Sequence, residues 1–139
     1  MGLLLFVIIK NMNLALLYKI SDALRASWSA ETSNSAEWSE DNPSMGQCAV
    51  TACVVQDYLG GEIVNVLASN EFGDGVSHYF NIIDGEVVDL TSGQFSEDVI
   101  FSKPQRKTGN YSTTREYCLS YPNTNKRYET LALKVAKLI

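Results

Sequence analysis

Residues 42–61, NPSMGQCAVTACVVQDYLGG, carry the clearest structural pattern in the chain. The opening Asn-Pro-Ser favours a turn. In the run that follows, apolar residues occupy more of the helix circumference than in a helix with one face exposed to solvent. Gly60 and Gly61 end this run, as glycine commonly does at the end of a helix. The stretch therefore predicts a buried central helix, with Cys48 in its first turn.

Cys48 occupies a position that favours reactivity. In the first turn of a helix, a thiol lies at the positive end of the helix dipole, beside backbone N–H groups without partners. Both features stabilise a thiolate, and the N–H groups can hold an oxyanion. The alternative is that Cys48 is a small buried apolar side chain, the commonest state of a free cysteine. Cys53 and Cys118 are predicted to be structural.

The composition limits the classes of function. A chain of 139 residues, 45% of them apolar, can bury a single core without metals or disulfides. A net charge of −5 and dispersed basic residues argue against a nucleic-acid partner. Three cysteines, one histidine and no CxxC pair indicate neither a disulfide framework nor a zinc site. We therefore expect no metal, no cofactor and a reducing, cytoplasmic location.

Helices are predicted near both ends of the chain. Residues 1–11 form an apolar extension that is too short to span a bilayer and lacks the features of a secretory signal. This extension is expected to be an upstream addition, a docking strand or a weak membrane contact. Residues 12–28 show the spacing of an amphipathic helix. A closing helix is predicted after Pro122, capped by Thr124 or Asn125.

The pattern after the central helix predicts a small antiparallel sheet. Residues 62–67 and 76–83 are rich in residues that favour strands, and residues 86–90 form a third extended segment. Asp84 and Gly85 lie between the last two segments and are typical of a two-residue hairpin turn. The predicted fold class is α+β, with the buried central helix packed on this sheet.

The hairpin also places the only histidine. With Asp84 and Gly85 as the loop residues, Phe80 lies opposite Asp89. His78 and Asp89 then become diagonal neighbours on one face, about 7 Å apart, which is within reach of a hydrogen bond. The alternatives are that His78 is only a hydrogen-bonded structural residue and that Asp89 only caps the following turn.

Cys48, His78 and Asp89 are a nucleophile, a base and a group that can orient the base, in that order along the chain. The nucleophile begins a helix, and the other two residues lie on antiparallel strands that follow. This arrangement resembles the papain-like superfamily, which includes papain-type peptidases, transglutaminases and NlpC/P60 amidases. The resemblance implies a papain-like single domain that acts on an amide or peptide carbonyl as a cysteine-dependent hydrolase or acyltransferase.

The same resemblance suggests further site residues. Papain-type enzymes carry an oxyanion-hole amide six residues before the nucleophile, where this chain has Asn42, one carbon shorter than glutamine. Gln47 is the alternative donor, with the backbone N–H of Cys48 as the second. Trp38 and Tyr79 are candidate substrate-binding residues. The expected partner is a peptide, a protein or a small amide, rather than a nucleic acid or a membrane.

A closer resemblance is to the YunG-like family of small bacterial proteins. It rests on SWSAETS (27–33), NPSMGQCAVTACVVQDYLGGEI (42–63), HYFN (78–81) and VDLTSGQF (88–95). This resemblance implies a domain that starts near Met12 and spans residues 12–139. It implies no particular reaction.

The sequence is also compatible with two non-enzymatic interpretations. In the first, a papain-like binding module recognises a peptide or small ligand in a groove between helix and sheet, lined by Trp28, Trp38, Tyr79 and Phe80. In the second, the apolar amino terminus docks on a membrane or a protein partner, and the cysteine is incidental.

Overall fold

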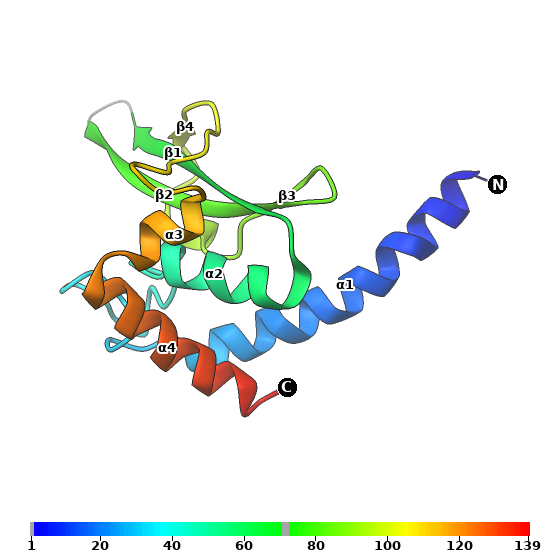
Figure 1. Cartoon of the computed structure of the whole chain (residues 1–139), viewed down its shortest axis with the longest axis horizontal. Helices are drawn as coiled ribbons and strands as arrows, with labels where there is room; N and C mark the ends of the chain where they lie inside the picture. Colours follow the sequence, from blue (N-terminus) through cyan, green and yellow to red (C-terminus); the bar gives the residue numbers. More distant parts are fainter. Residues whose placement is uncertain (1, 71–72) are drawn as a thin grey trace.

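The computed structural model describes the backbone of residues 2–70 and 73–139 and the side chains of residues 14–70 and 75–139. The described chain has an α+β architecture, with a curved antiparallel sheet on one side and helices on the other (Figure 1). The helices are α1 (Gly2–Ser27), α2 (Cys48–Leu59), α3 (Thr114–Leu119) and α4 (Pro122–Ala136), with a short 3-10 helix η1 (Ser92–Gln94). The strands β1 (Glu62–Asn70), β2 (Gly73–Ile83), β3 (Glu86–Val88) and β4 (Ile100–Phe101) are ordered β3-β2-β1-β4.

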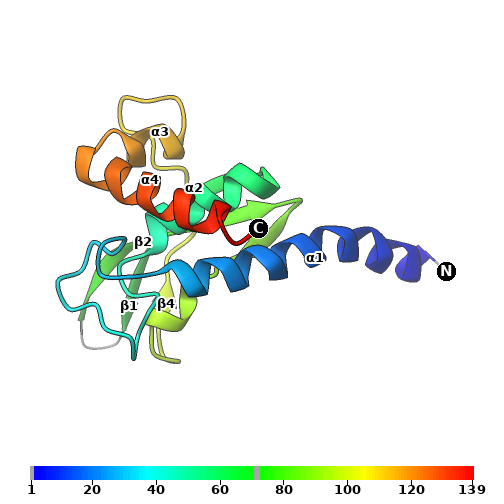
Figure 2. The ribbon, with the colours of Figure 1, turned by 90° about the horizontal axis from the view of Figure 1, so that it is seen from below.

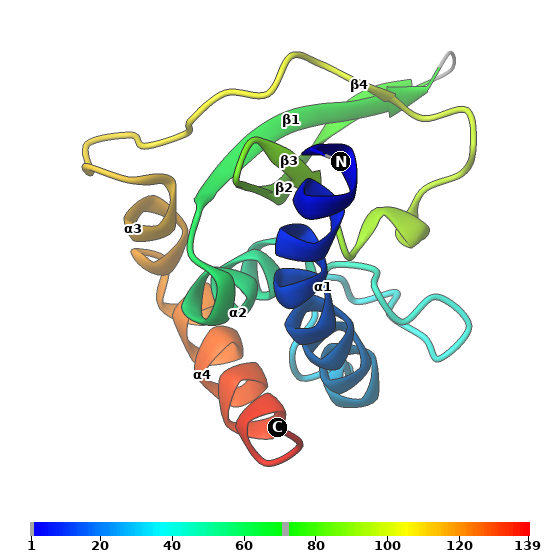
Figure 3. The ribbon, with the colours of Figure 1, turned by 90° about the vertical axis from the view of Figure 1, so that its right-hand side faces the viewer.

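Helix α2 is the central element, as predicted. Six consecutive residues, 50–55, are buried. Since one helical turn takes 3.6 residues, six buried residues in a row require neighbours all around the helix. Figure 3 shows these neighbours: the sheet on one side, and α1 and α4 on the other. In the view from below (Figure 2), α4 crosses in front of part of α2, and α1 runs on the other side of α4.

The predicted hairpin between β2 and β3 is present. Asp84 and Gly85 have φ values of 51° and 78°, as a type I′ turn requires, and Ile83 pairs with Glu86. β3 ends at Val88, so Asp89 follows directly after the last paired residue.

The two faces of β2 have different neighbours. Asn81 lies on the face toward α2, where its side-chain Nδ2 donates a 2.9 Å hydrogen bond to the carbonyl of Ala52. Phe80 lies on the opposite face and packs with Val64 and Val66 of β1. Because side chains alternate along a strand, His78 shares the face of Phe80.

The ends of the chain differ from the prediction in two respects. Residues 2–11 are helical and continue into α1, so they do not form a docking strand. The side chains of residues 1–13 lie outside the described part of the chain. Helix α4 begins at Pro122 itself, with Tyr121 as its N-cap, and not with a cap at Thr124 or Asn125. The reason is that proline suits the first helical position, where its fixed φ is helical and no N–H is needed.

None of the helices, over the residues that the structure describes, has both the length and the apolar character needed to cross a membrane.

Candidate functional site

Cys48 is the first residue of α2, as predicted, and 8% of its surface is exposed. The backbone N–H groups of Cys48, Ala49 and Val50 have no hydrogen-bond acceptor among the described residues, as is normal for the first turn of a helix. Gly46, two residues earlier, has a φ of 72° that turns the chain into the helix. The thiol therefore lies at the dipole end of α2, beside unpaired donors.

His78 and Asp89 form the hydrogen bond that the hairpin geometry predicts. Nε2 of His78 lies 2.7 Å from Oδ2 of Asp89. His78 is completely buried, and 10% of the Asp89 side chain is exposed. The other carboxylate oxygen, Oδ1, accepts from the backbone N–H of Thr91 at 3.3 Å and from its hydroxyl at 3.5 Å. Asp89 therefore both orients His78 and closes the turn after β3.

Cys48 also influences the His78 ring. Nε2 is occupied by Asp89, so Nδ1 is the nitrogen left for the sulfur; it is buried and makes no direct hydrogen bond within the described residues. Burial alone would lower the pKa of His78, but the hydrogen bond with Asp89 and the nearby Cys48 sulfur outweigh it and raise the pKa to about 9. The ring is therefore positively charged at neutral pH.

Three phenylalanine rings surround the imidazole. Phe95 meets it edge-on at 4.8 Å between ring centres, and Phe101 and Phe80 lie at 5.4 Å and 5.9 Å. Only Phe80 shares the strand of His78, and no spacing rule connects the other two with it. Long-range packing brings Phe95 and Phe101 to the ring.

The two candidate oxyanion residues have different surroundings. Gln47 is completely buried, and its Nε2 donates a 3.0 Å hydrogen bond to the carbonyl of Ser29, while its Oε1 has no partner in the described residues. Asn42 is half-buried in a turn, where its backbone N–H donates to Ser39. Their oxyanion role stays a prediction, and one donor capacity of Gln47 is already used.

Trp28 joins the loop before α2 to that helix, whereas Trp38 forms its hydrogen bond within the loop. Nε1 of Trp28 donates to the hydroxyl of Thr51 in the first turns of α2, and Nε1 of Trp38 donates to the carbonyl of Pro43, both at 2.9 Å. Tyr79 is half-buried on the α2 side of the sheet, on the face opposite His78. That Trp38 and Tyr79 bind substrate stays a prediction.

Cys53 and Cys118 differ from Cys48 in their surroundings. Both are buried, and burial is the main cause that raises the pKa of Cys53 to about 12 and that of Cys118 to about 11. Both thiols are therefore neutral at physiological pH, which suits residues of the core.

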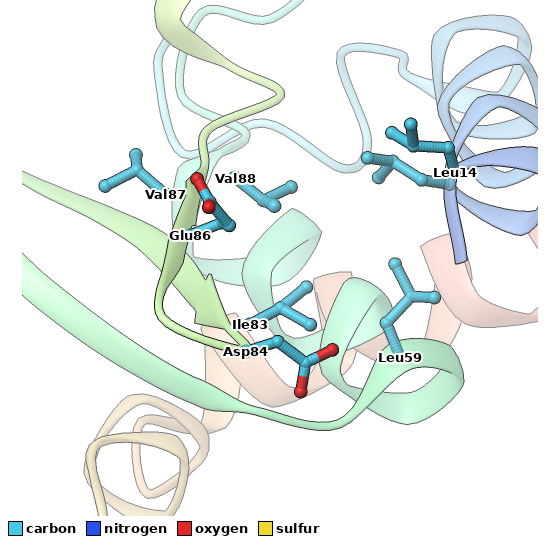
Figure 4. Close-up of a pocket in the computed structure, with 8 residues that line it drawn as sticks. Leu14, Leu59, Ile83, Asp84, Glu86, Val87 and Val88 are labelled. Carbon is cyan, nitrogen blue, oxygen red and sulfur yellow. The ribbon is translucent and has the colours of Figure 1, made fainter. Parts of the chain in front are cut away.

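An apolar hollow of about 270 Å³ is visible in Figure 4, and its lining includes none of Cys48, His78 and Asp89. It opens between α1, the end of α2 and the hairpin, and no spacing in the sequence pointed to it. Its lining combines six aliphatic side chains with two hairpin acids: Leu14, Leu17, Leu59, Ile83, Val87 and Val88 with Asp84 and Glu86.

Comparison with known proteins places the chain in a family. A sequence model of the family described as YunG protein matches residues 16–139. The Bacillus subtilis (strain 168) protein named Uncharacterized protein YunG is 41% identical over 76 residues, which are 55% of this chain and 60% of that protein. The match thus spans less than two thirds of that relative. No solved structure matches the chain. Because the family match includes all of α2, the sheet and α4, the chain belongs to the YunG protein family.

Proposed function

We propose that this protein is a papain-like cysteine hydrolase or acyltransferase that acts on an amide or peptide carbonyl. The observation that supports this most is the hydrogen bond between Nε2 of His78 and Asp89, which leaves Nδ1 buried and without a partner in the described residues. Cys48 is also among the groups that raise the pKa of His78. A nucleophile that begins a helix, with the base on strand β2 and the acid directly after β3, resembles the papain-like arrangement. The substrate would be a peptide, a protein or a small amide.

The first half of the reaction forms an acyl-enzyme. The Cys48 thiolate attacks the carbonyl carbon, and the carbonyl electron pair moves to the oxygen. Protonated His78 then gives its proton to the leaving nitrogen as the carbon–nitrogen bond breaks, which leaves a thioester on Cys48. Asp89 keeps the ring oriented throughout, and the positive ring passes through its neutral form.

The second half regenerates the thiolate. Neutral His78 takes a proton from water, or from an acceptor amine or alcohol, as that molecule attacks the thioester carbonyl. When the carbon–sulfur bond breaks, the product leaves, and His78 keeps the proton and faces the Cys48 thiolate again. Water as the acceptor gives a hydrolase, and another nucleophile gives a transferase.

The start of α2 is suited to stabilise the tetrahedral intermediate. The free N–H of Cys48 would donate one hydrogen bond to the oxyanion, and Asn42 or the second N–H of Gln47 would donate another. Removing one such donor costs roughly 10²- to 10³-fold in rate in known enzymes. A cytoplasmic location would keep the thiol reduced.

Alkylation by iodoacetamide at pH 7 tests the activated thiol, with labelling at each cysteine followed by peptide mass spectrometry. Cys48 should react fastest, and Cys53 and Cys118 act as internal controls because their raised pKa values keep them neutral. His78→Ala should lower the Cys48 rate by about 10²-fold or more, since it removes the positive partner of the thiolate. Labelling of Cys48 at the rate of the other two would contradict the proposal.

A second candidate function is a non-catalytic papain-like module that binds a peptide or small ligand. The closed surroundings of the site favour it, because Cys48 is only 8% exposed and His78 is completely buried. The hollow between α1 and the hairpin would then be the binding site, since concave apolar surfaces with a few polar groups are typical of ligand pockets. Slow alkylation of Cys48, unchanged by His78→Ala, would support this module.

A further inference from the structure

We propose that Gln94 is a positioning residue, which holds the segment before Cys48 in register with the turn that carries Asp89. This inference rests on the proposed function and adds a residue to it. Gln94 ends η1 and touches neither the sulfur nor the His78 ring in any hydrogen bond or ring contact of the described residues. Its effect on the site would therefore be indirect.

The side-chain amide of Gln94 joins two segments that lie far apart in the sequence. Its Oε1 accepts from the backbone N–H of Gly46 at 3.3 Å, and its Nε2 donates to the carbonyl of Thr91 at 3.0 Å. One planar amide thus links the turn before Cys48 with the turn after β3. The Ser44 hydroxyl adds a longer contact to the same Thr91 carbonyl, at 3.5 Å.

Both ends of this bridge are fixed. Gly46 has a positive φ, its carbonyl accepts from the N–H of Asn34 at 2.9 Å, and a Cβ atom there would come within 2.3 Å of the Ser33 hydroxyl. Thr91 is 1% exposed and bonds Asp89 through its N–H and its hydroxyl. A displacement at either end would therefore be passed to the residues of the site.

The contacts form a closed circuit. It runs from Cys48 back to Gly46, across Gln94 to Thr91, on to Asp89, and through His78 to the sulfur. Thirty positions of chain separate Cys48 from His78, so their distance depends on contacts of this kind and on the packing of α2. A misplacement of about 1 Å between reacting groups can lower a rate about 10²-fold.

The test compares Gln94→Met and Gln94→Asn with Gln56→Met. Methionine keeps the length of the side chain but has no amide, and asparagine keeps the amide but cannot reach both partners. Gln56 is the matched control, because its side chain also makes two hydrogen bonds, to Gly61 and Arg115, at the other end of α2. The readouts are the alkylation rate of Cys48, the pKa of His78 by NMR and the melting temperature.

Gln94→Met should lower the alkylation rate roughly 10- to 100-fold and lower the pKa of His78 from about 9, while the protein still melts cooperatively. Gln94→Asn should have the same direction of effect, and Gln56→Met should change only the melting temperature. If both Gln94 variants lower the melting temperature but leave rate and pKa unchanged, or if neither folds, Gln94 is structural and the proposal is overturned.

The two proposals fail in different ways. Slow alkylation of Cys48 in the wild-type protein would reject the proposed function, whereas the pKa of His78 would still report whether Gln94 positions Asp89. Fast wild-type alkylation that Gln94→Met leaves unchanged, with an unchanged pKa, would reject only the role of Gln94.

Discussion

His78 is the residue at which opposing physical effects meet. Complete burial disfavours a charged ring, because the charge loses its hydration. The hydrogen bond to Asp89 and the neighbouring sulfur of Cys48 favour the charged ring, and they prevail. A buried cation is stable only with such partners, so the protonation of His78 depends directly on the geometry of the other two residues.

Asp89→Asn should lower the pKa of His78 from about 9 toward or below its ordinary value of 6.5. Asparagine can still accept a hydrogen bond but carries no negative charge, so burial then has the larger effect. The chain has a single histidine, so NMR of the imidazole follows His78 without assignment.

The matched control for this titration is Asp98→Asn, which removes an exposed acid from the same segment and should leave the pKa of His78 unchanged. A wild-type pKa of His78 near 6.5, or one that Asp89→Asn does not change, would show that the Asp89 carboxylate does not raise the pKa of His78.

At the scale of elements, Arg115 of α3 connects three helices. Its Nη1 donates to the carbonyl of Cys53 at 3.0 Å and to Oε1 of Gln56 at 3.1 Å, both on α2. Its Nη2 lies 2.8 Å from the carboxylate of Asp57 and donates to the hydroxyl of Tyr128 on α4 at 2.9 Å. These contacts hold α2, the helix that begins with Cys48, at residues 53–57 and not at its first turn.

Arg115→Met should lower the free energy of unfolding by about 1–3 kcal/mol, because the carbonyl of Cys53 and the carboxylate of Asp57 lose a charged donor. Urea denaturation measures this difference. The alkylation rate of Cys48 should change by less than about twofold, since the bonds at the start of α2 remain. A large loss of rate at unchanged stability would contradict this division between stability and reactivity.

At the scale of the whole molecule, the raised pKa of His78 predicts how stability depends on pH. The folded protein holds this proton up to a pH of about 9, and the unfolded chain only up to 6.5. The titratable groups that act on the ring are Asp89, from the turn after β3, and Cys48, from α2. The stabilising effect is therefore complete below pH 6.5 and is lost as pH rises through 9.

The free energy of unfolding should fall between pH 6.5 and 9 by up to about 3 kcal/mol, as urea denaturation at a series of pH values would measure. His78→Gln should flatten this decline. Cys53 and Cys118 lower the free energy of unfolding with rising pH only above their unfolded pKa of 9.0, because their raised pKa values favour the neutral thiols in the folded protein. Stability that stays constant or rises over this range would contradict the prediction.

Local rules sufficed for much of the fold and for one contact of the site. The apolar run and the two glycines predicted α2 with Cys48 in its first turn, because helix periodicity and helix ends depend on neighbouring residues. Asp84 and Gly85 fixed the register of the hairpin and so predicted the contact between His78 and Asp89, since pairing in a hairpin follows from its turn. The predicted start of α4 was wrong, because Pro122 can begin a helix as well as interrupt one.

The chain therefore specifies, through short-range order, a buried helix headed by a cysteine and a hairpin that pairs a histidine with an acid. Folding in three dimensions adds what no local pattern contains: the approach of Cys48 to His78, the phenylalanine rings around the imidazole and the bridge made by Gln94. The physical reason is separation along the chain. Contacts between segments dozens of residues apart depend on how α2, the sheet and the loops pack together, and this packing is a property of the whole core.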